Sequence, residues 1–537
     1  MEQRRNRVDI GRAPSGRSRE GGLGEPVSSS LVRGWQPRPE APTDRMSIHW
    51  PIIRTLLRRP TRTLIVDDRR AWRGIELLVG ALHLAAEIER RSESPHIGVL
   101  LPTSGAFPMA ALGAWIAGRV VVPLNYLLAR DELQYVIDDC GTDLILTAGP
   151  MLEHLGYQPR VRTMLPLEEV GFAGVPEVRW PALARADDLG VLLYTSGTSG
   201  KPKGVELTHG NIRANIDQCR RWSGFNDGDV VLGVLPQFHC FGLTVLTLLP
   251  LTVGARVVFT ARFVPQKIVR LFQEHRPTVF VGIPSMFNAL LSVKAAGPAD
   301  FASLRFAVSG GEPLPDAVAG AFRERLGVTI NEGYGLTETS PVTNWCMPRD
   351  HAAHSVGPPL PGVLERIVDP STGAAMGVNE EGEVRIKGPN VMRGYYRLPD
   401  LTAQVFDDEG WFRTGDIGRL DERGRLSITG RLKEMIIVGG ENVFPREIEE
   451  VLNAHPSVAA SGVIGVRDEV RGELPWAWVE LKEGASFDEA SLRSWCRERL
   501  AGYKVPREIR VVAHLPRNPT GKIVRRALHA LVNEDSP

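Results

Sequence analysis

Strand-like and helix-like apolar patterns alternate along the first part of the chain. Short apolar runs such as HIGVLLP (96–102) have the composition of buried strands, and the segment Ile75–Arg91 repeats apolar residues at helical spacing. The same rhythm returns between RVVFT (256–260) and RFAVSGG (305–311). Strands that alternate with helices predict an α/β fold whose sheets are largely parallel. Ligands of such sheets bind at the carboxyl ends of the strands, so we expect a site in the loops there.

The pattern changes after about Asp369. Short strand-like runs with glycine-containing turns follow, and the stretch from Glu434 onward has strand and helix patterns of its own. A chain of 537 residues exceeds one ordinary core, and about 100 residues suffice for a separate domain. The sequence therefore predicts a large N-terminal α/β domain of mixed, largely parallel sheets and a small α+β domain. The expected bounds are 47–430 for the large domain, 431–433 for a hinge and 434–537 for the small domain.

Charge and cysteine content exclude several function classes. The formal net charge is +1, so general nucleic-acid binding is not expected. Five cysteines are scattered without C-x-x-C spacing. This distribution argues against a disulfide framework or a zinc site, and it is typical of a reducing, cytoplasmic setting.

Two features bear on targeting. Residues 1–46 are polar and rich in Arg, Gly and Ser, so we expect a disordered basic tail rather than a secretory signal, with Met46 as an alternative start. The apolar stretches Gly105–Tyr126 and Val231–Phe259 contain charged residues and prolines. Neither has the ~20 uninterrupted apolar residues of a spanning helix, so no transmembrane segment is predicted. Peripheral membrane contact stays open.

The run YTSGTSGKPKGV (194–205) follows a short apolar strand pattern. Glycines let a backbone turn its N–H groups toward a ligand, hydroxyls add donors, and Lys201 and Lys203 add positive charge. The run favours a polyphosphate-binding loop, with a flexible surface hairpin as the alternative. Its spacing differs from the G-x-x-x-x-G-K-[ST] of a P-loop, because no Ser or Thr follows either lysine at the required place.

Six segments in a fixed order carry a resemblance to a known family. They are YTSGTSGKPKGV, SGGEPL, NEGYGLTETS, WFRTGD, GRLKEMIIVGGENVFPREIE and PRNPTGKIVR. Over about residues 50–530 the chain resembles the acyl-adenylate-forming superfamily, most of all its long-chain fatty-acid–CoA ligases. The resemblance implies an AMP-forming acid–thiol ligase (acyl-CoA synthetase) that acts in two steps. A carboxylate attacks the α-phosphate of ATP and expels pyrophosphate, and a thiol then attacks the acyl-adenylate and expels AMP.

The resemblance also implies the triphosphate and magnesium contacts. Glu338 matches the magnesium-ligating carboxylate and Thr337 a contact of the α-phosphate. One carboxylate suffices, because Mg²⁺ also takes phosphate oxygens. Since both reactants are anions, neutralising their charge is the main catalytic requirement, and Thr198 and Glu338 are catalytic candidates. The implied phosphate-binding residues are Thr195, Ser196, Gly197, Thr198, Ser199, Gly200 and Lys203.

For the nucleoside, the resemblance implies that Tyr334 stacks on the adenine base and that Asp416 accepts both ribose hydroxyls. Arg431 would contact ribose and phosphate with a permanent charge. The plain alternative for Asp416 is a turn aspartate after Gly415. Related ligases often have Gln where this chain has Glu332. The implied adenine-binding residues are Gly310, Gly311, Glu312, Gly333, Tyr334 and Gly335.

The small domain, implied to be mobile, carries the remaining groups. Lys522 in PTGKIVR matches a catalytic lysine whose ammonium would stabilise charge between the carboxylate and the α-phosphate. Lys433 matches the hinge about which the small domain would rotate between the half-reactions. That rotation would remove Lys522 and bring Gly439 and Gly440 beside the channel of the pantetheine arm, where glycines permit close approach.

Three features bear on the acid. His239 in PQFHCFGL matches a residue near the substrate carboxylate in acyl- and aryl-CoA ligases, and a packed core histidine is the alternative. No Asp follows Phe238 to pair with an α-ammonium, so amino acids are not expected. The apolar residues Gly282, Met286 and Phe287 suit an acyl chain, so a medium- or long-chain fatty acid is expected.

The expected cofactors are ATP and Mg²⁺, with coenzyme A as co-substrate. Coenzyme A is the expected acceptor because GGENVFPREIE (439–449) has no insertion of the kind that hinders domain rotation. Three alternatives stay open: an acyl-AMP ligase that loads an acyl carrier protein, an aryl-CoA ligase, and a catalytically inactive nucleotide-binding scaffold.

Overall fold

The computed structural model describes residues 47–177, 180–196, 201–439, 441–468, 470–517 and 523–533. The expectation for residues 1–46 lies outside these ranges. Within them, none of the helices combines the length and the hydropathy that crossing a membrane requires.

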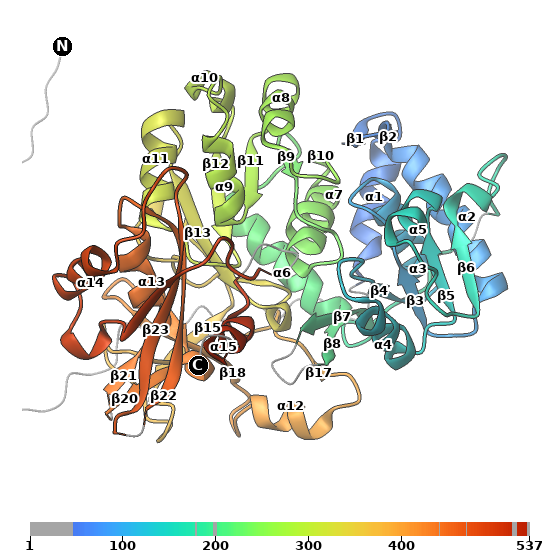
Figure 1. Ribbon diagram of the computed structural model, residues 1–537. Helices are drawn as coiled ribbons and strands as arrows, with labels where there is room; N and C mark the ends of the chain where they lie inside the picture. The colour runs from blue at the N-terminus through green and yellow to red at the C-terminus, as the bar shows by residue number, and fades with distance from the viewer. Residues whose placement is uncertain are drawn as a thin grey trace, which may run out of the picture. The chain divides into compact units, whose positions relative to one another are not determined.

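Two largely parallel sheets form the frame of the N-terminal part (Figure 1). Their strand orders are β14-β13-β12-β11-β9-β10-β1-β2 and β17-β8-β7-β4-β3-β5-β6. Antiparallel pairs occur at β1–β2, β13–β14, β7–β8 and β8–β17. The prediction of mixed, largely parallel sheets is therefore confirmed.

Three of these strands, β3, β10 and β12, lie within the predicted runs 96–102, 256–260 and 305–311. The first sheet contains β1 Thr63–Val66, β2 Ala71–Arg73, β9 Val230–Gly233, β10 Arg256–Phe259, β11 Val279–Gly282, β12 Phe306–Gly310, β13 Ile330–Gly335 and β14 Val342–Trp345. The second contains β3 His96–Val99, β4 Val120–Pro123, β5 Leu144–Thr147, β6 Thr163–Pro166, β7 Leu189–Ser196, β8 Pro202–Thr208 and β17 Gly394–Tyr395.

Helices connect the strands of both sheets. They are α1 His49–Arg58, α2 Gly74–Arg91, α3 Ala106–Ile116, α4 Arg130–Cys140, α5 Gly149–Leu155, α6 His209–Ser223, α7 Leu249–Val253, α8 Pro265–His275, α9 Pro284–Leu291, α10 Pro298–Phe301, α11 Asp316–Leu326 and α12 Pro399–Val405. The predicted helix Ile75–Arg91 is α2, which begins one residue earlier.

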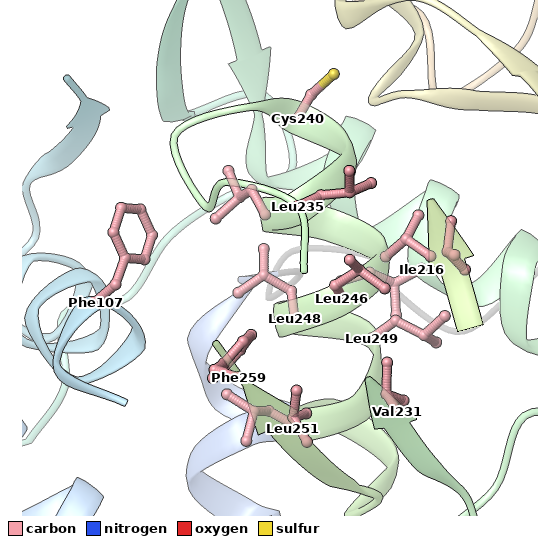
Figure 2. Packing of buried hydrophobic residues seen from close by; sticks show 14 of the residues in the cluster. Phe107, Ile216, Val231, Leu235, Cys240, Leu246, Leu248, Leu249, Leu251 and Phe259 are labelled. Atoms are coloured by element: carbon pink, nitrogen blue, oxygen red, sulfur yellow. The ribbon is translucent and has the colours of Figure 1, made fainter. Parts of the chain in front are cut away.

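The apolar stretch Val231–Phe259 belongs to the core. It contains most of β9, a π-helix at Phe241–Leu248, α7 and β10. Figure 2 shows side chains from these elements packed together, including Leu246 and Leu249, and both are fully buried. Burial inside the domain therefore accounts for the hydropathy of this stretch.

The chain then forms an antiparallel sheet and a smaller C-terminal domain with its own core. The antiparallel sheet is β15-β16-β18-β19, and the sheet of the small domain is β21-β20-β23-β22 with β24 beside β23. Leu426 belongs to the core of the N-terminal part, whereas Ile436 belongs to a separate core. The structure thus has a large α/β domain and a smaller α+β domain, as predicted; the bounds 47–430, 431–433 and 434–537 stay a prediction.

The helices and strands of the antiparallel sheet and the small domain are β15 Leu364–Val368, β16 Gly382–Lys387, β18 Phe412–Leu420, β19 Leu426–Arg431, β20 Ile436–Val438, β21 Glu441–Val443, α13 Pro445–Asn453, β22 Val458–Asp468, β23 Gly472–Leu481, α14 Glu489–Arg497, β24 Glu508–Val511 and α15 Arg525–Asn533.

Two buried histidines lie next to each other at the start of α1. His49 Nε2 donates to the carbonyl of Ala182 at 3.0 Å, and His209 Nδ1 accepts from the N–H of Ile48 at 3.1 Å. The pKa of both rings is lowered to about 4, mainly by burial, and in His209 also by the neighbouring His49. Protonation of His209 Nδ1 would set two donors against each other, so this contact requires a neutral His209 ring. For His49, burial disfavours the charged form.

We expect the free energy of unfolding to decrease as the pH falls from about 7 toward about 5. The folded-state pKa of about 4 lies below the ordinary value of 6.5, so in this interval the unfolded chain takes up protons that the folded chain does not. Each histidine should lower the free energy of unfolding by about 2 kcal/mol at about pH 5 relative to about pH 8. Urea denaturation at both pH values measures the loss.

His49→Gln is the matched variant for this measurement. Its amide keeps a donor for the Ala182 carbonyl and does not titrate, so the pH-dependent loss should shrink by about 2 kcal/mol. A variant that is as sensitive to acid as the parent chain would contradict the assignment.

Candidate functional site

The β7–β8 hairpin carries the predicted phosphate loop. Thr195 pairs with Lys203 across the two strands, so both lie on one face next to the end of β7 at Ser196. The pKa of Lys203 is lowered by burial and then by the charge of Lys433, while Glu338 acts in the opposite direction. Lys203 therefore lies close to one further lysine and to the carboxylate of Glu338. Gly197, Thr198, Ser199 and Gly200 lie outside the described residues.

The predicted magnesium ligand is held by a tyrosine that the sequence prediction missed. Glu338 lies in a single 3₁₀ turn, Thr337–Thr339, and its Oε1 accepts a hydrogen bond from the Tyr395 hydroxyl at 2.8 Å. Tyr395 reaches it from β17, which pairs with β8, and the Lys203 ammonium lies 5.6 Å from the centre of its ring. The available signal in the sequence was the aromatic pair in GYYR (394–397).

The described residues fit magnesium only together with phosphate. Within the described ranges, no three His, Cys, Asp or Glu side chains gather where they would hold a metal ion. A lone carboxylate such as Glu338 is sufficient when phosphate oxygens and water complete the coordination of Mg²⁺.

The adenine-binding candidates lie where two neighbouring parallel strands end. Gly310 of β12 pairs with Gly333 of β13, and Gly311, followed by Glu312, has a φ of 83°. A Cβ at Gly310 would lie 2.8 Å from the ring of Phe241. Glycine at 310 is thus required by the close approach of Phe241, which the sequence does not reveal.

A buried carboxylate lies at the meeting point of three strands. Asp416 of β18 is 2% exposed. Its Oδ2 accepts a hydrogen bond from the Tyr334 hydroxyl of β13 at 2.6 Å, and its Oδ1 lies 2.7 Å from Nε of Arg431 in β19. The charge of Asp416 raises the pKa of Arg431, and burial raises that of Tyr334. The carboxylate is therefore fixed in orientation, as recognition of a vicinal diol requires. Gly335 ends the strand that carries Tyr334.

His239 is exposed rather than packed in the core. Desolvation by the surrounding protein lowers the pKa of its ring. Its Nδ1 accepts from the N–H of Phe241 at 3.3 Å. The neighbouring Cys240 Sγ lies 3.4 Å from Oγ1 of the buried Thr337. The alternative of a packed core histidine is therefore wrong.

One residue that was expected near the acyl chain belongs to the core instead. Phe287 is fully buried, with its ring 5.1 Å from that of Phe280 and 5.3 Å from that of Phe322. Met286 is only partly buried. Of the two neighbouring side chains, Met286 is the one still available to an acyl chain.

Lys433 is described, whereas Lys522 and Gly440 are not. Lys433 lies in the 3₁₀ turn Leu432–Glu434, close enough to Lys203 to lower its pKa. Gly439 has a φ of 61° in the turn between β20 and β21, and a Cβ there would meet no described atom within 4 Å. The turn therefore accounts for this glycine. Gly440 and Lys522 lie outside the described residues.

A cavity of about 600 Å³ lies beside these residues. It is lined by residues before the predicted hinge, such as Ile417 and Ile428, and by residues after it, such as Phe444 and Arg446. Its described lining includes none of the predicted nucleotide contacts. The site is therefore assigned from the chemistry of its side chains and not from this cavity.

Two family models and several known proteins match the chain. A family model described as AMP-binding enzyme matches residues 54–396, and one described as AMP-binding enzyme C-terminal domain matches residues 447–522. A long-chain-fatty-acid–CoA ligase of Bacillus subtilis is 33% identical, covering 91% of this chain and 95% of the relative. A feruloyl-CoA synthase of Amycolatopsis is also 33% identical, covering 89% and 97%. The crystal structure of ATP-bound MatB from Rhodopseudomonas palustris has a TM-score of 0.82 at 31% identity, covering 91% and 99%.

Proposed function

The chain belongs to the AMP-binding enzyme family, and we propose that it joins a medium- or long-chain fatty acid to coenzyme A through an acyl-adenylate. Acid–thiol ligation is the activity in the names of the relatives, whereas the acid differs between fatty acid and ferulate. The observation that carries the proposal is the buried carboxylate of Asp416, which contacts Arg431 of β19 and Tyr334 of β13. The chain continues from β13 to Glu338.

The proposed roles follow from charge. Asp416 accepts the ribose hydroxyls, and Lys203 neutralises the triphosphate. Glu338, oriented by Tyr395, holds Mg²⁺, which when bound offsets phosphate charge. His239 borders the space for the acid carboxylate, whose attack on the α-phosphate expels pyrophosphate.

Two further assignments are part of the proposal. Residues 431–433 are the hinge between the large domain, 47–430, and the small domain, 434–537, which presents Lys522 first and the turn at Gly439 second. A cytoplasmic location is supported by the five cysteines, all of which are free and buried.

A panel of acids tests the proposal. With ATP, Mg²⁺ and coenzyme A, we expect octanoate or hexadecanoate to exceed ferulate and benzoate at least about 10-fold in kcat/KM, because each buried methylene contributes about 0.8 kcal/mol. Acyl-CoA and AMP are the measured products.

Other results of the acid panel would favour a different function. A preference for ferulate would favour the aryl-CoA ligase, a second candidate supported by equal identity to the feruloyl-CoA synthase. Acid-dependent pyrophosphate release without acyl-CoA would favour loading of an acyl carrier protein. Absence of acid-dependent pyrophosphate release with all four acids would overturn the proposal.

A further inference from the structure

Two residues of the proposed hinge, Leu432 and Lys433, lie between two groups of ion pairs. On the upstream side, Arg431 pairs with Asp416 through its side chain at 2.7 Å and through the backbone register of β18 and β19. The chain is thus fixed to the sheet of the large domain as far as Arg431. On the downstream side, the chain enters the sheet of the small domain only at Ile436, the first residue of β20.

Three charged side chains form a cluster at the segment before β20. We call it the Arg525 cluster, and it consists of Arg525, Glu434 and Glu449. Arg525 Nη1 lies 2.6 Å from Oε2 of Glu434, and Arg525 Nη2 lies 2.9 and 2.7 Å from the two carboxylate oxygens of Glu449. Glu449 Oε1 also accepts from the N–H of Val463 at 2.9 Å. The Arg525 cluster therefore joins the residue after Lys433 to α13 and to the first residue of α15.

Desolvation of the three charged side chains offsets part of the free energy that their ion pairs contribute to stability. The three side chains are between 13% and 31% exposed, and burial raises the pKa of Glu449. Replacing buried ion pairs by apolar residues is often neutral or stabilising, so a gain in stability does not by itself account for these partly buried pairs. A guanidinium can fix the orientation of both partners, because its rigid fork donates to two carboxylates at once.

We propose that Arg525 is a positioning residue that makes Glu434, next to the hinge, and the start of α15 move as one body. Lys522 lies three residues before Arg525 in the sequence. The proposal rests on the roles assigned to Lys433 and Lys522 above. With both ion-pair groups in place, rotation is confined to Leu432 and Lys433.

The two half-reactions should depend on this cluster differently. The turn at Gly439 is held by β20 and β21 and by its own N–H, which donates to the carbonyl of Arg471 at 2.7 Å. None of these three contacts involves Arg525. Loosening the Arg525 cluster should therefore impair adenylation, which requires Lys522, and spare thioester formation, which uses the turn.

Two variants and one matched control test the proposal. Glu434→Gln breaks the link to the hinge but keeps the pair between Arg525 and Glu449, and Arg525→Met breaks both links. Glu489→Gln alters an ion pair within α14, with Arg493, remote in sequence from the hinge. Each protein is assayed for acid-dependent ATP–pyrophosphate exchange and for acyl-CoA formation from supplied acyl-adenylate, with the best acid of the panel above.

We expect Glu434→Gln to lower the kcat of exchange about 10-fold, because small displacements of a catalytic group are costly. Its KM for ATP and its rate of thioester formation should stay within about 2-fold, as should both activities of Glu489→Gln. Arg525→Met should lower the kcat of exchange at least as much as Glu434→Gln does. The double variant Glu434→Gln/Arg525→Met should lose no more than Arg525→Met alone, since Glu434 acts through its contact with Arg525.

Equal losses in both half-reactions would show a merely structural role, and unchanged exchange in Glu434→Gln would also overturn the proposal. Should Arg525→Met fail to fold, Glu434→Gln still decides. Lys522→Ala separates this inference from the proposed function. If the parent chain shows no exchange, the proposed function is wrong and not merely the role of Arg525. If Lys522→Ala retains exchange, the role assigned to Lys522 is wrong, and this inference falls with it while the proposed function stands.

Discussion

Replacement of Lys522 by Ala should slow acid-dependent ATP–pyrophosphate exchange about 10²- to 10³-fold and leave thioester formation from supplied acyl-adenylate within about 2-fold. In the first half-reaction a carboxylate approaches an α-phosphate, and both groups carry negative charge. A cation placed between them stabilises the transition state more than the separated reactants, so its loss lowers kcat. In the second half-reaction a neutral or thiolate sulfur attacks a mixed anhydride, and under the proposed rotation of the small domain Lys522 has left the site by then.

The matched control removes a neighbouring positive charge. Arg526 is exposed on α15, and Arg526→Ala should leave both half-reactions within about 2-fold, because exposed charges contribute little at moderate salt. Lys522→Arg keeps the charge but moves it, and we expect it to recover only part of the exchange. Equal loss in both half-reactions of Lys522→Ala would contradict the role proposed for the lysine.

The sequence predicts the parts of the fold that depend on local pattern. The apolar spacing of Ile75–Arg91 and the capping carboxylate of Glu76, which accepts from the N–H of Arg73 at 2.6 Å, act within one helix, and α2 is observed there. The glycine-rich motifs are local too, since the ends of β12 and β13 fall at Gly310 and Gly335. Pattern and motif therefore locate the strand ends at which the site is built.

Contacts between distant segments are not predictable in this way. Tyr395 is 57 residues from Glu338 in sequence, and β17 brings it close by pairing with β8. Likewise, Arg525 and Glu434 are 91 residues apart. Phe287 has the composition of a pocket residue, but its position on α9 turns it toward Phe280 in the core. Such side chains are positioned by tertiary packing, which one sequence does not display.

Asp416→Asn should lower kcat/KM for ATP about 10²-fold or more. Hydrogen bonds to a charged acceptor contribute about 1.5–3 kcal/mol each, and two ribose hydroxyls are proposed to donate to this carboxylate. The amide would also turn its NH₂ toward one of two donors, the Tyr334 hydroxyl or the Arg431 guanidinium, which lie 2.6 and 2.7 Å from the carboxylate oxygens. Steady-state kinetics with ATP measures the loss.

ATP analogues that lack one ribose hydroxyl distinguish two roles of Asp416: recognition of the ribose, and positioning of Arg431 and Tyr334. The parent chain should lose about 10-fold in kcat/KM with 2′-deoxy-ATP or 3′-deoxy-ATP, and Asp416→Asn should lose much less, because the partner of the hydroxyl is already gone. Tyr334→Phe removes a donor to Asp416 but leaves the carboxylate, so it should keep the discrimination against both deoxynucleotides. If Asp416→Asn discriminates as strongly as the parent chain, the carboxylate only holds Arg431 and Tyr334 in place, and the ribose must be recognised elsewhere.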